Sequence, residues 1–71
     1  MKLHYYPETD SLYIELSPRA SVESKEVAAG LVADFDKNGN VVGFDIDQAS
    51  TKLDLHTLEA DSLQTSRVRV A

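Results

Sequence analysis

Apolar side chains recur at every second position on both sides of one short polar stretch, Lys37-Asn38-Gly39-Asn40. A side-chain period of two is that of a β-strand with one buried face. Asn-Gly is the strongest short-range signal for a hairpin, because both residues tolerate the positive φ of a type I′ turn. We therefore predict a hairpin of residues 31–36 and 41–47, with its turn centred on Asn38-Gly39. Its apolar cross-strand pairs are Phe35–Val42, Ala33–Phe44 and Leu31–Ile46.

A second hairpin is predicted for residues 2–6 and 11–16, which flank Pro7-Glu8-Thr9-Asp10. Proline has a fixed φ and no amide to donate, so it suits a loop better than a central strand. With these four residues as the loop, the register runs from Tyr6–Ser11 to Lys2–Glu15. One face then carries Leu3, Tyr5, Leu12, Ile14 and Leu16, and the other carries His4, Tyr6, Tyr13 and the Lys2–Glu15 pair.

The rest of the chain is less regular. Residues 22–28 predict a short polar strand, and Gly30 marks a bulge or turn, so residues 22–36 form either one bent strand or two. Residues 49–55 favour a short helix with Ser50 as its N-cap and Ala49 and Leu53 across the sheet. The fold class predicted is α+β, mostly β: antiparallel hairpins or a meander of four or five strands, with a short C-terminal helix. We expect one domain over 1–71, with the core sheet in 1–48 and an extended or mobile segment at 56–71, which adds an edge strand, wraps a partner or frays.

Size and charge narrow the functional classes. A chain of 71 residues without cysteine has a thin core and no disulfide or zinc–thiolate support, which favours self-association. A net charge of −5 with scattered basic residues argues against nucleic-acid binding. No apolar run reaches membrane-spanning length and none resembles a signal peptide, so we expect a cytoplasmic protein without membrane contact.

One motif resembles the calcium loop of an EF-hand. Counted from Asp34, oxygen ligands fall at positions one, three and five, glycine at six and a carboxylate at twelve. The flanking segments alternate with period two, whereas an EF-hand requires helices. The preferred interpretation is a tight turn beside a solvated acidic face of Asp34, Asp36, Asp45 and Asp47. Divalent-metal (calcium) binding is the alternative, with Asp34, Asp36, Asn38 and Asp45 as ligands.

The other candidate sites are weaker. His56 and Glu59 stand three apart, as ligands on one helical face do, with Asp54 or Asp61 as a third ligand. Polar residues of a mobile segment are the preferred interpretation. His4 opposite Tyr13 is an exposed cross-strand pair and not a catalytic base. No serine lies in a G-x-S-x-G elbow and no glycine-rich phosphate loop is present, so we expect neither an enzyme nor a cofactor.

Three runs of sequence carry a resemblance to a known family. They are YPETDSLYIEL at 6–16, EVAAGLVADFD at 26–36 and GNVVGFDI at 39–46, followed by Ala49-Ser50. Together they resemble the bacterial domain-of-unknown-function family numbered 2283. The resemblance implies a small β-rich domain with a short helix and no assigned catalytic residue. It also implies a partner-binding role, because some relatives are encoded beside small toxin-like proteins.

These observations predict a small protein–protein interaction module, antitoxin-like or regulatory. We expect it to self-associate and to bind a small basic protein, because an acidic chain complements a basic partner.

Overall fold

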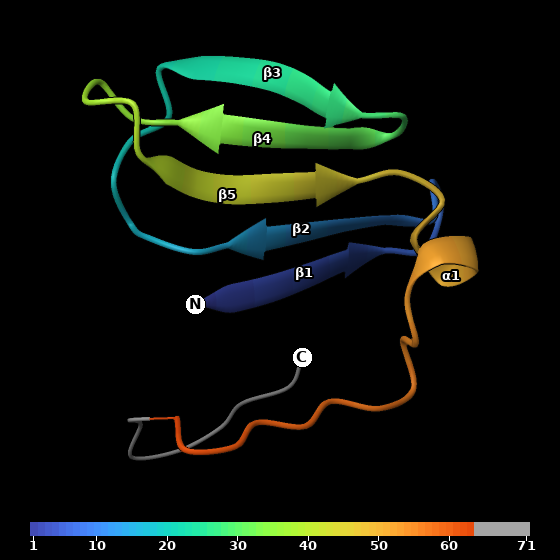
Figure 1. Ribbon diagram of the computed structural model, residues 1–71. Coiled ribbons are helices and arrows are strands. Elements are labelled where there is room, and N and C mark those ends of the chain that lie inside the picture. The colour runs from blue at the N-terminus through green and yellow to red at the C-terminus, as the bar shows by residue number, and fades with distance from the viewer. Residues whose placement is uncertain (64–71) are drawn as a thin grey trace.

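The computed structural model describes residues 1–63 and contains one antiparallel sheet of five strands and one short helix. The elements are β1 (Lys2–Tyr6), β2 (Ser11–Glu15), β3 (Glu23–Ala28), β4 (Leu31–Phe35), β5 (Val41–Ile46) and α1 (Ala49–Lys52). The strand order is β1-β2-β5-β4-β3, so β1 and β3 form the two edges (Figure 1). The predicted α+β, mostly β fold with a short C-terminal helix is confirmed.

The first hairpin has the predicted register at every position. Tyr6 pairs with Ser11 and Lys2 with Glu15, and the three pairs between them follow in order. His4 therefore lies opposite Tyr13, as predicted, and its ring lies 5.1 Å from that of Tyr6 on the same face. Turn chemistry and alternation agree here, because a one-residue slip would exchange the two faces.

The second hairpin follows the prediction except near its turn. Leu31–Ile46 and Ala33–Phe44 pair as predicted, but Phe35 pairs with Val41 and not with Val42, because the register shifts after Asp34. The predicted type I′ turn is also wrong: of its two central residues only Gly39 has a positive φ, of 81°. The amide of Gly39 donates to the carbonyl of Asp36 over 3.1 Å, and that of Asp36 to the carbonyl of Asn40 over 2.9 Å. Such a loop is a turn followed by a glycine bulge.

Residues 22–36 form two strands, which settles the question that the sequence pattern left open. β3 pairs with β4 from Glu23–Phe35 to Ala28–Leu31, and Gly30 turns the chain with a φ of 71°. The register shifts between Glu26 and Ala28, so the bulge lies within β3. β3 is thus an edge strand that combines a bulge with charged side chains, two features that discourage further strand pairing.

The pairing of β2 with β5 joins the two halves of the sheet. Leu12 lies opposite Ile46 and Ile14 opposite Phe44. Leu12 and Ile46 are buried together with Ala49 of α1, and these residues form the centre of the small core. The first hairpin and the β3–β4–β5 meander therefore share their hydrophobic centre across this one pair of strands.

Gly43 lets an aromatic ring cross the middle of the sheet. A Cβ atom at this position would lie 2.8 Å from Cζ of Tyr13 and 3.2 Å from the carbonyl oxygen of Ile14. Because glycine leaves this space free, the Tyr13 hydroxyl reaches over β5 and donates to Asp34 Oδ2 on β4 over 3.1 Å. Asp34 Oδ1 in turn accepts from the Ser24 hydroxyl on β3 over 2.6 Å. One chain of contacts thus connects four strands.

The helix is shorter than predicted and is capped differently. It ends at Lys52, and its N-cap residue is Gln48, which has a left-handed backbone and no side-chain cap. The predicted cap, Ser50, lies inside the helix, where its amide and hydroxyl donate to the carboxylate of Asp10 over 3.0 and 2.6 Å. The carbonyl of Asp10 also accepts from the amide of Ala49 over 2.9 Å. Asp10, in the loop of the first hairpin, therefore supplies the cap from a distant part of the sequence.

Within residues 1–63, no helix has the length and apolar character needed to cross a bilayer.

Gly43→Ala should lower the free energy of unfolding by about 1–3 kcal/mol, because its methyl group overpacks against the Tyr13 ring. Urea denaturation measures this loss. In a Tyr13→Ala background the same substitution should cost clearly less, since the ring is gone. Equal costs in both backgrounds would show that Tyr13 is not the reason for the glycine.

Candidate functional site

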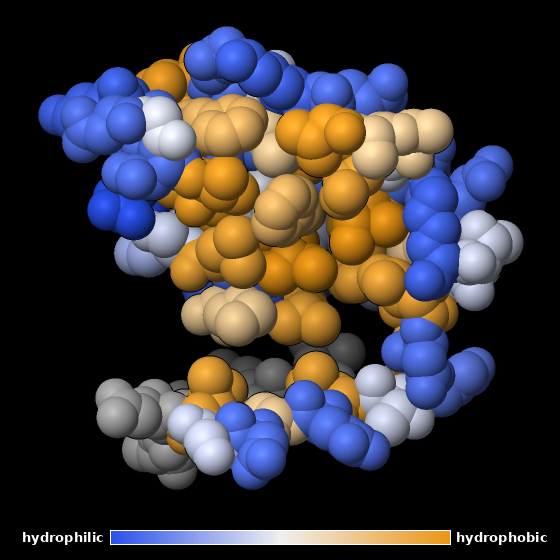
Figure 2. Space-filling view, in the orientation of Figure 1, coloured by the Kyte–Doolittle hydropathy of each residue, from blue (hydrophilic) through white to orange (hydrophobic). Residues whose placement is uncertain are grey.

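One face of the sheet is apolar and partly exposed. We use the name apolar face for the side chains Leu3, Tyr5, Leu12, Ile14, Leu31, Ala33, Phe44 and Ile46, which occupy two cross-strand rows of β1, β2, β5 and β4. The middle of the face is buried, but Leu3 and Tyr5 on β1 remain 40% and 42% exposed. Figure 2 shows this face as a broad hydrophobic area over the strands. The helix α1 packs on one end of this face through Ala49.

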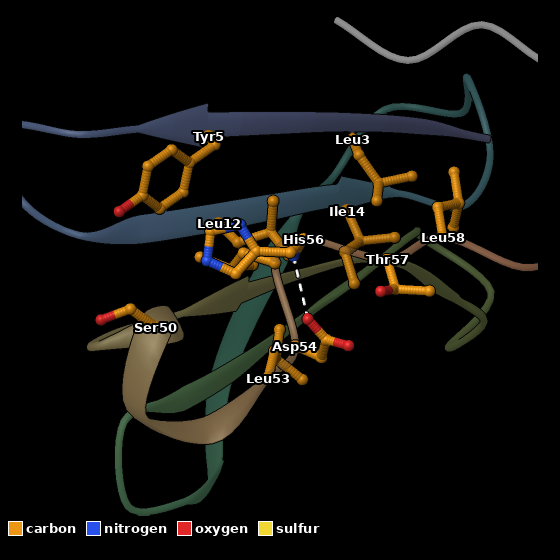
Figure 3. Close-up of a pocket in the computed structure, with 11 residues that line it drawn as sticks. Leu3, Tyr5, Leu12, Ile14, Ser50, Leu53, Asp54, His56, Thr57 and Leu58 are labelled. Atoms are coloured by element: carbon orange, nitrogen blue, oxygen red, sulfur yellow. Dashed lines mark hydrogen bonds between the residues drawn. The ribbon is translucent and has the colours of Figure 1, made fainter.

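A groove runs between the apolar face and the chain that follows α1. We call residues 53–63 the C-terminal arm; it passes below β1 and faces it across the hollow seen in Figure 2. The groove has a volume of about 760 Å³, and Figure 3 shows the side chains around it. The sheet contributes Leu3, Tyr5, Leu12 and Ile14, and the arm contributes Leu53, Leu55 and Leu58 with the polar Asp54, His56 and Thr57. Apolar groups therefore line both walls.

The arm wall is also acidic. Asp54, Glu59 and Asp61 lie within residues 53–63, and this stretch has no lysine or arginine. The Asp54 carboxylate accepts from the amide of His56 over 3.0 Å. This hydrogen bond, and a second one from the Thr57 side chain, hold the pKa of Asp54 below its usual value. The groove thus presents leucines beside a carboxylate that stays ionised.

The opposite face of the sheet is polar and is organised around Asp34. Both of its carboxylate oxygens accept hydrogen bonds, one from Tyr13 and one from Ser24. Burial of the ring, and next the hydrogen bond to Asp34, raise the pKa of Tyr13 above its ordinary value. Tyr13 therefore remains protonated near neutral pH and ties the strands together.

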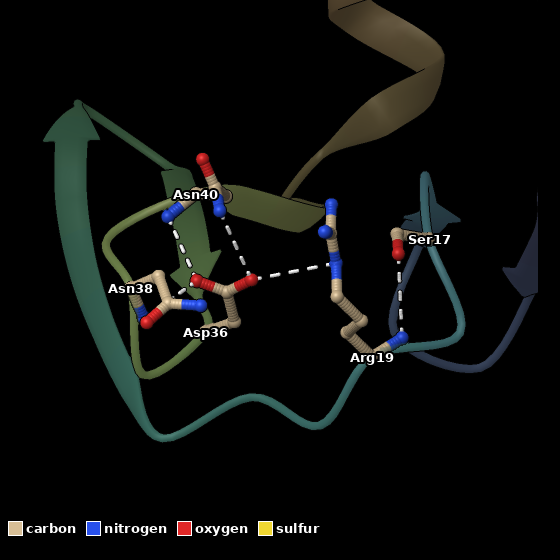
Figure 4. A network of polar contacts seen from close by, with 5 residues as sticks. All are labelled: Ser17, Arg19, Asp36, Asn38 and Asn40. Carbon is tan, nitrogen blue, oxygen red and sulfur yellow. Dashed lines mark hydrogen bonds and ion pairs between the residues drawn. The ribbon is translucent and has the colours of Figure 1, made fainter.

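Asp36 organises the turn of the second hairpin. Its Oδ1 accepts from the amides of Asn38 and Asn40, each over 2.9 Å, and its Oδ2 lies 3.4 Å from Nε of Arg19 (Figure 4). The residue is only 5% exposed, so the prediction that it belongs to a solvated acidic face is wrong. The amide of Asn40 contributes most to a lowered pKa of Asp36, which burial alone would raise. The same bonds explain why the loop is wider than a type I′ turn.

The residues considered as metal ligands do not converge. Asp34 and Asp36 are directed to the protein donors described above, and Asp45 is exposed on β5. Across residues 1–63, no three histidine or carboxylate side chains come together in a way that could hold a metal ion. The helix that would have aligned His56 with Glu59 ends at Lys52.

Two features of the surface were not predicted from the sequence. The first is the anchoring of α1 by Asp10, because its partner Ser50 lies as far as 40 residues further along the sequence. The second is the groove, although Leu53, Leu55 and Leu58, with polar residues between them, are visible in the sequence. That pattern indicates an amphipathic segment but not the surface beside which it lies. The predicted extended or mobile segment, 56–71, is described as far as residue 63 and has no helix or strand there; its remainder lies outside the described residues.

The comparisons with known proteins cover the sheet but not the arm. A family model described as "Protein of unknown function (DUF2283)" matches residues 2–50, which include every strand and the beginning of α1. No curated protein and no solved structure shows a significant match to the chain. The apolar face therefore belongs to the matched region, whereas the arm lies beyond it.

Stability should fall with acid through Asp36, and also through Asp10, whose pKa the Ser50 and Tyr5 hydroxyls lower. A carboxyl with a lowered folded-state pKa stabilises the fold above its unfolded value, about 3.9, and this contribution disappears as the pH falls through the folded value. We expect the melting temperature of the wild type to fall as the pH is lowered below about 4. Asp36→Asn should have a lower melting temperature at neutral pH and a weaker dependence of that temperature on acid.

Asp45→Asn is the matched control, because the Asp45 side chain is exposed and its carboxylate forms no hydrogen bond or ion pair within residues 1–63. It should retain the wild-type acid dependence. An Asp36→Asn protein with an unchanged pH profile would show that the turn does not depend on this carboxylate.

Proposed function

Because the chain belongs to the DUF2283 family of proteins of unknown function, we propose its role from its own surfaces: it is a protein–protein interaction module. One observation carries the proposal. A five-stranded sheet leaves most of one apolar face without a second layer in the described part of the chain. Stable domains bury such a face against another element, so another polypeptide is its natural cover.

The amount of exposed apolar surface supports this role. Leu3 and Tyr5 on the sheet, and Leu55 and Leu58 on the arm, are 37–51% exposed although they lie around one groove. Scattered apolar side chains are common on protein surfaces, but a contiguous apolar groove with a polar rim marks an interaction site. A partner that inserted apolar side chains here would remove both walls from water at once.

The charge of the arm defines the partner class. A segment in this groove meets leucines at its base and Asp54 at the rim, with Glu59 and Asp61 further along the arm. A small basic protein with an amphipathic segment satisfies both, because its lysines or arginines face the carboxylates while its apolar side chains enter the groove. An antitoxin-like or regulatory role, in which this acidic chain covers a basic protein, follows from that pairing.

Calcium binding is not part of the proposal. The first two carboxylates of the alternative calcium site, Asp34 and Asp36, are hydrogen-bonded to Tyr13, Ser24 and backbone amides. A metal ion would have to displace these donors.

The proposal can be tested with a defined probe, a labelled helical peptide that carries leucines on one side and lysines on the other. Fluorescence anisotropy should show saturable binding to the full chain. Leu55→Asp should weaken binding at least about tenfold, because it places a charge on the apolar wall. Val22→Asp, at an apolar residue that is 65% exposed outside the groove, should bind as the wild type does.

A peptide of the same composition with scrambled order provides the second control, since it keeps the charge but loses the apolar side. Equal binding of the two peptides, or an unaffected Leu55→Asp protein, would reduce the interaction to general charge attraction and refute the groove as a site. Co-expression with the product of the adjacent gene then tests whether the natural partner is basic.

A further inference from the structure

We infer that a second copy of this chain covers the apolar face in solution, so that two sheets pack face to face as a weak two-fold dimer. The inference deepens the proposed function, on which it rests, because both require an accessible apolar face. It identifies a second copy as the molecule that covers that face before a tighter partner displaces it. Three properties of the face support a second copy: the position of its charges, its boundaries and its size.

The acidic side chains of the strands do not oppose this contact. The carboxylates of the four strands that form the apolar face, those of Glu15, Asp34 and Asp45, lie in the alternate positions and hence on the polar face. Packed sheets are about 10 Å apart, and the polar faces of a dimer lie beyond both of them. That separation exceeds the Debye length of about 8 Å at physiological salt. The carboxylates of the strands therefore add little repulsion to a face-to-face dimer, whereas those of the arm, Asp54, Glu59 and Asp61, lie at its margin and weaken it.

The margins of the face restrict how a second copy can lie. On the β3 side, Lys25 lies opposite Ala33 in the same cross-strand row as Phe44, and its ammonium lies 5.8 Å from the centre of the Phe35 ring. A charge directed to the apolar side of an edge strand discourages burial there. On the β1 side the arm borders the groove. The uncharged area is thus β1, β2, β5 and β4, and two such areas suit the aligned packing of a β-sandwich.

The size of the face indicates a weak dimer and not an obligate one. Four strands spaced about 4.8 Å apart, with about five residues each at 3.3 Å, cover roughly 320 Å² per copy. With the leucines of the two arms at the margins, the pair buries on the order of 1,000 Å² in total, below the roughly 1,600 Å² of a standard interface. Interfaces of this size support transient association, so we expect a micromolar dissociation constant. A partner that binds more tightly can then displace the second copy.

Sedimentation equilibrium of the full chain from about 1 to 500 µM tests the inference. The average mass of the wild type should rise with concentration from 7.8 kDa towards twice that value. Leu3→Asp should raise the dissociation constant at least about tenfold, because it places a charge on the face. Leu3 is already 40% exposed, so the variant should still fold, as circular dichroism and the melting temperature can verify. Val22→Asp carries the same added charge outside the face and should dimerise as the wild type does.

The possible outcomes separate this inference from the proposed function. A wild-type dimer that Leu3→Asp weakens and Val22→Asp leaves intact supports the second copy. A chain that remains monomeric at every concentration overturns it, and so does a dimer that is indifferent to Leu3→Asp. In the last two cases, saturable binding of the amphipathic peptide leaves the interaction module intact, whereas its absence removes both. If circular dichroism and the melting curve show that Leu3→Asp does not fold, Leu3→Ser is measured in its place and the same criteria apply.

Discussion

The sheet depends on the pairing of β2 with β5. Each of its hairpins forms from neighbouring segments, and this pair joins the N-terminal hairpin to the rest of the sheet, with support from the bonds of Asp10 to α1 and of Tyr13 to Asp34. The pair brings Leu12 opposite Ile46, and α1 completes the same cluster through Ala49. Gly43 is part of the same constraint, because it clears the path by which Tyr13 crosses β5 to reach Asp34. Without this strand pair the molecule would consist of the β1–β2 hairpin and the β3–β4–β5 meander, each of them marginal and without a core of its own.

The sequence predicted the local pairing well, because local pairing is governed by turns and alternation. The whole register of the first hairpin and the greater part of the second follow from these two signals. The errors occur where a side chain intervenes. Asp36 binds two backbone amides and so widens the turn, which moves Phe35 from Val42 to Val41. A pattern of apolar and polar residues contains no information on such a bond.

Contacts between distant segments could not be predicted in the same way. Asp10 and Ser50 are each typical of a turn or a helix start, and nothing in their own neighbourhoods assigns them to each other. The placement of the arm is similar: its leucines indicate an apolar surface nearby, but the surface itself is assembled only when β1 and β2 join the sheet. The predicted interaction role was a matter of charge and size, and the structure adds a specific surface to which that role can be assigned.

The alternation that builds the sheet also separates its polar and apolar side chains onto two faces. Residues of one parity form the apolar face, and those of the other parity form the hydrogen-bonded line from Tyr13 through Asp34 to Ser24. The polar face thus stabilises the molecule, while the apolar face remains available for contact. The family match includes both faces but stops before the arm. The sheet is therefore the part that this chain shares with the family model, and the arm is the part that the proposed partner would read in addition.

The position of β5 late in the sequence has a consequence for biosynthesis. A hairpin such as β1–β2 forms within microseconds once it is free, whereas β2 must wait for Val41–Ile46 to be translated before its second edge is paired. At about 5–20 residues per second, the ribosome takes on the order of seconds to deliver that stretch. For that interval the nascent hairpin carries two open edges and an uncovered leucine-rich side. A newly made molecule is therefore most prone to aggregation before its fifth strand arrives.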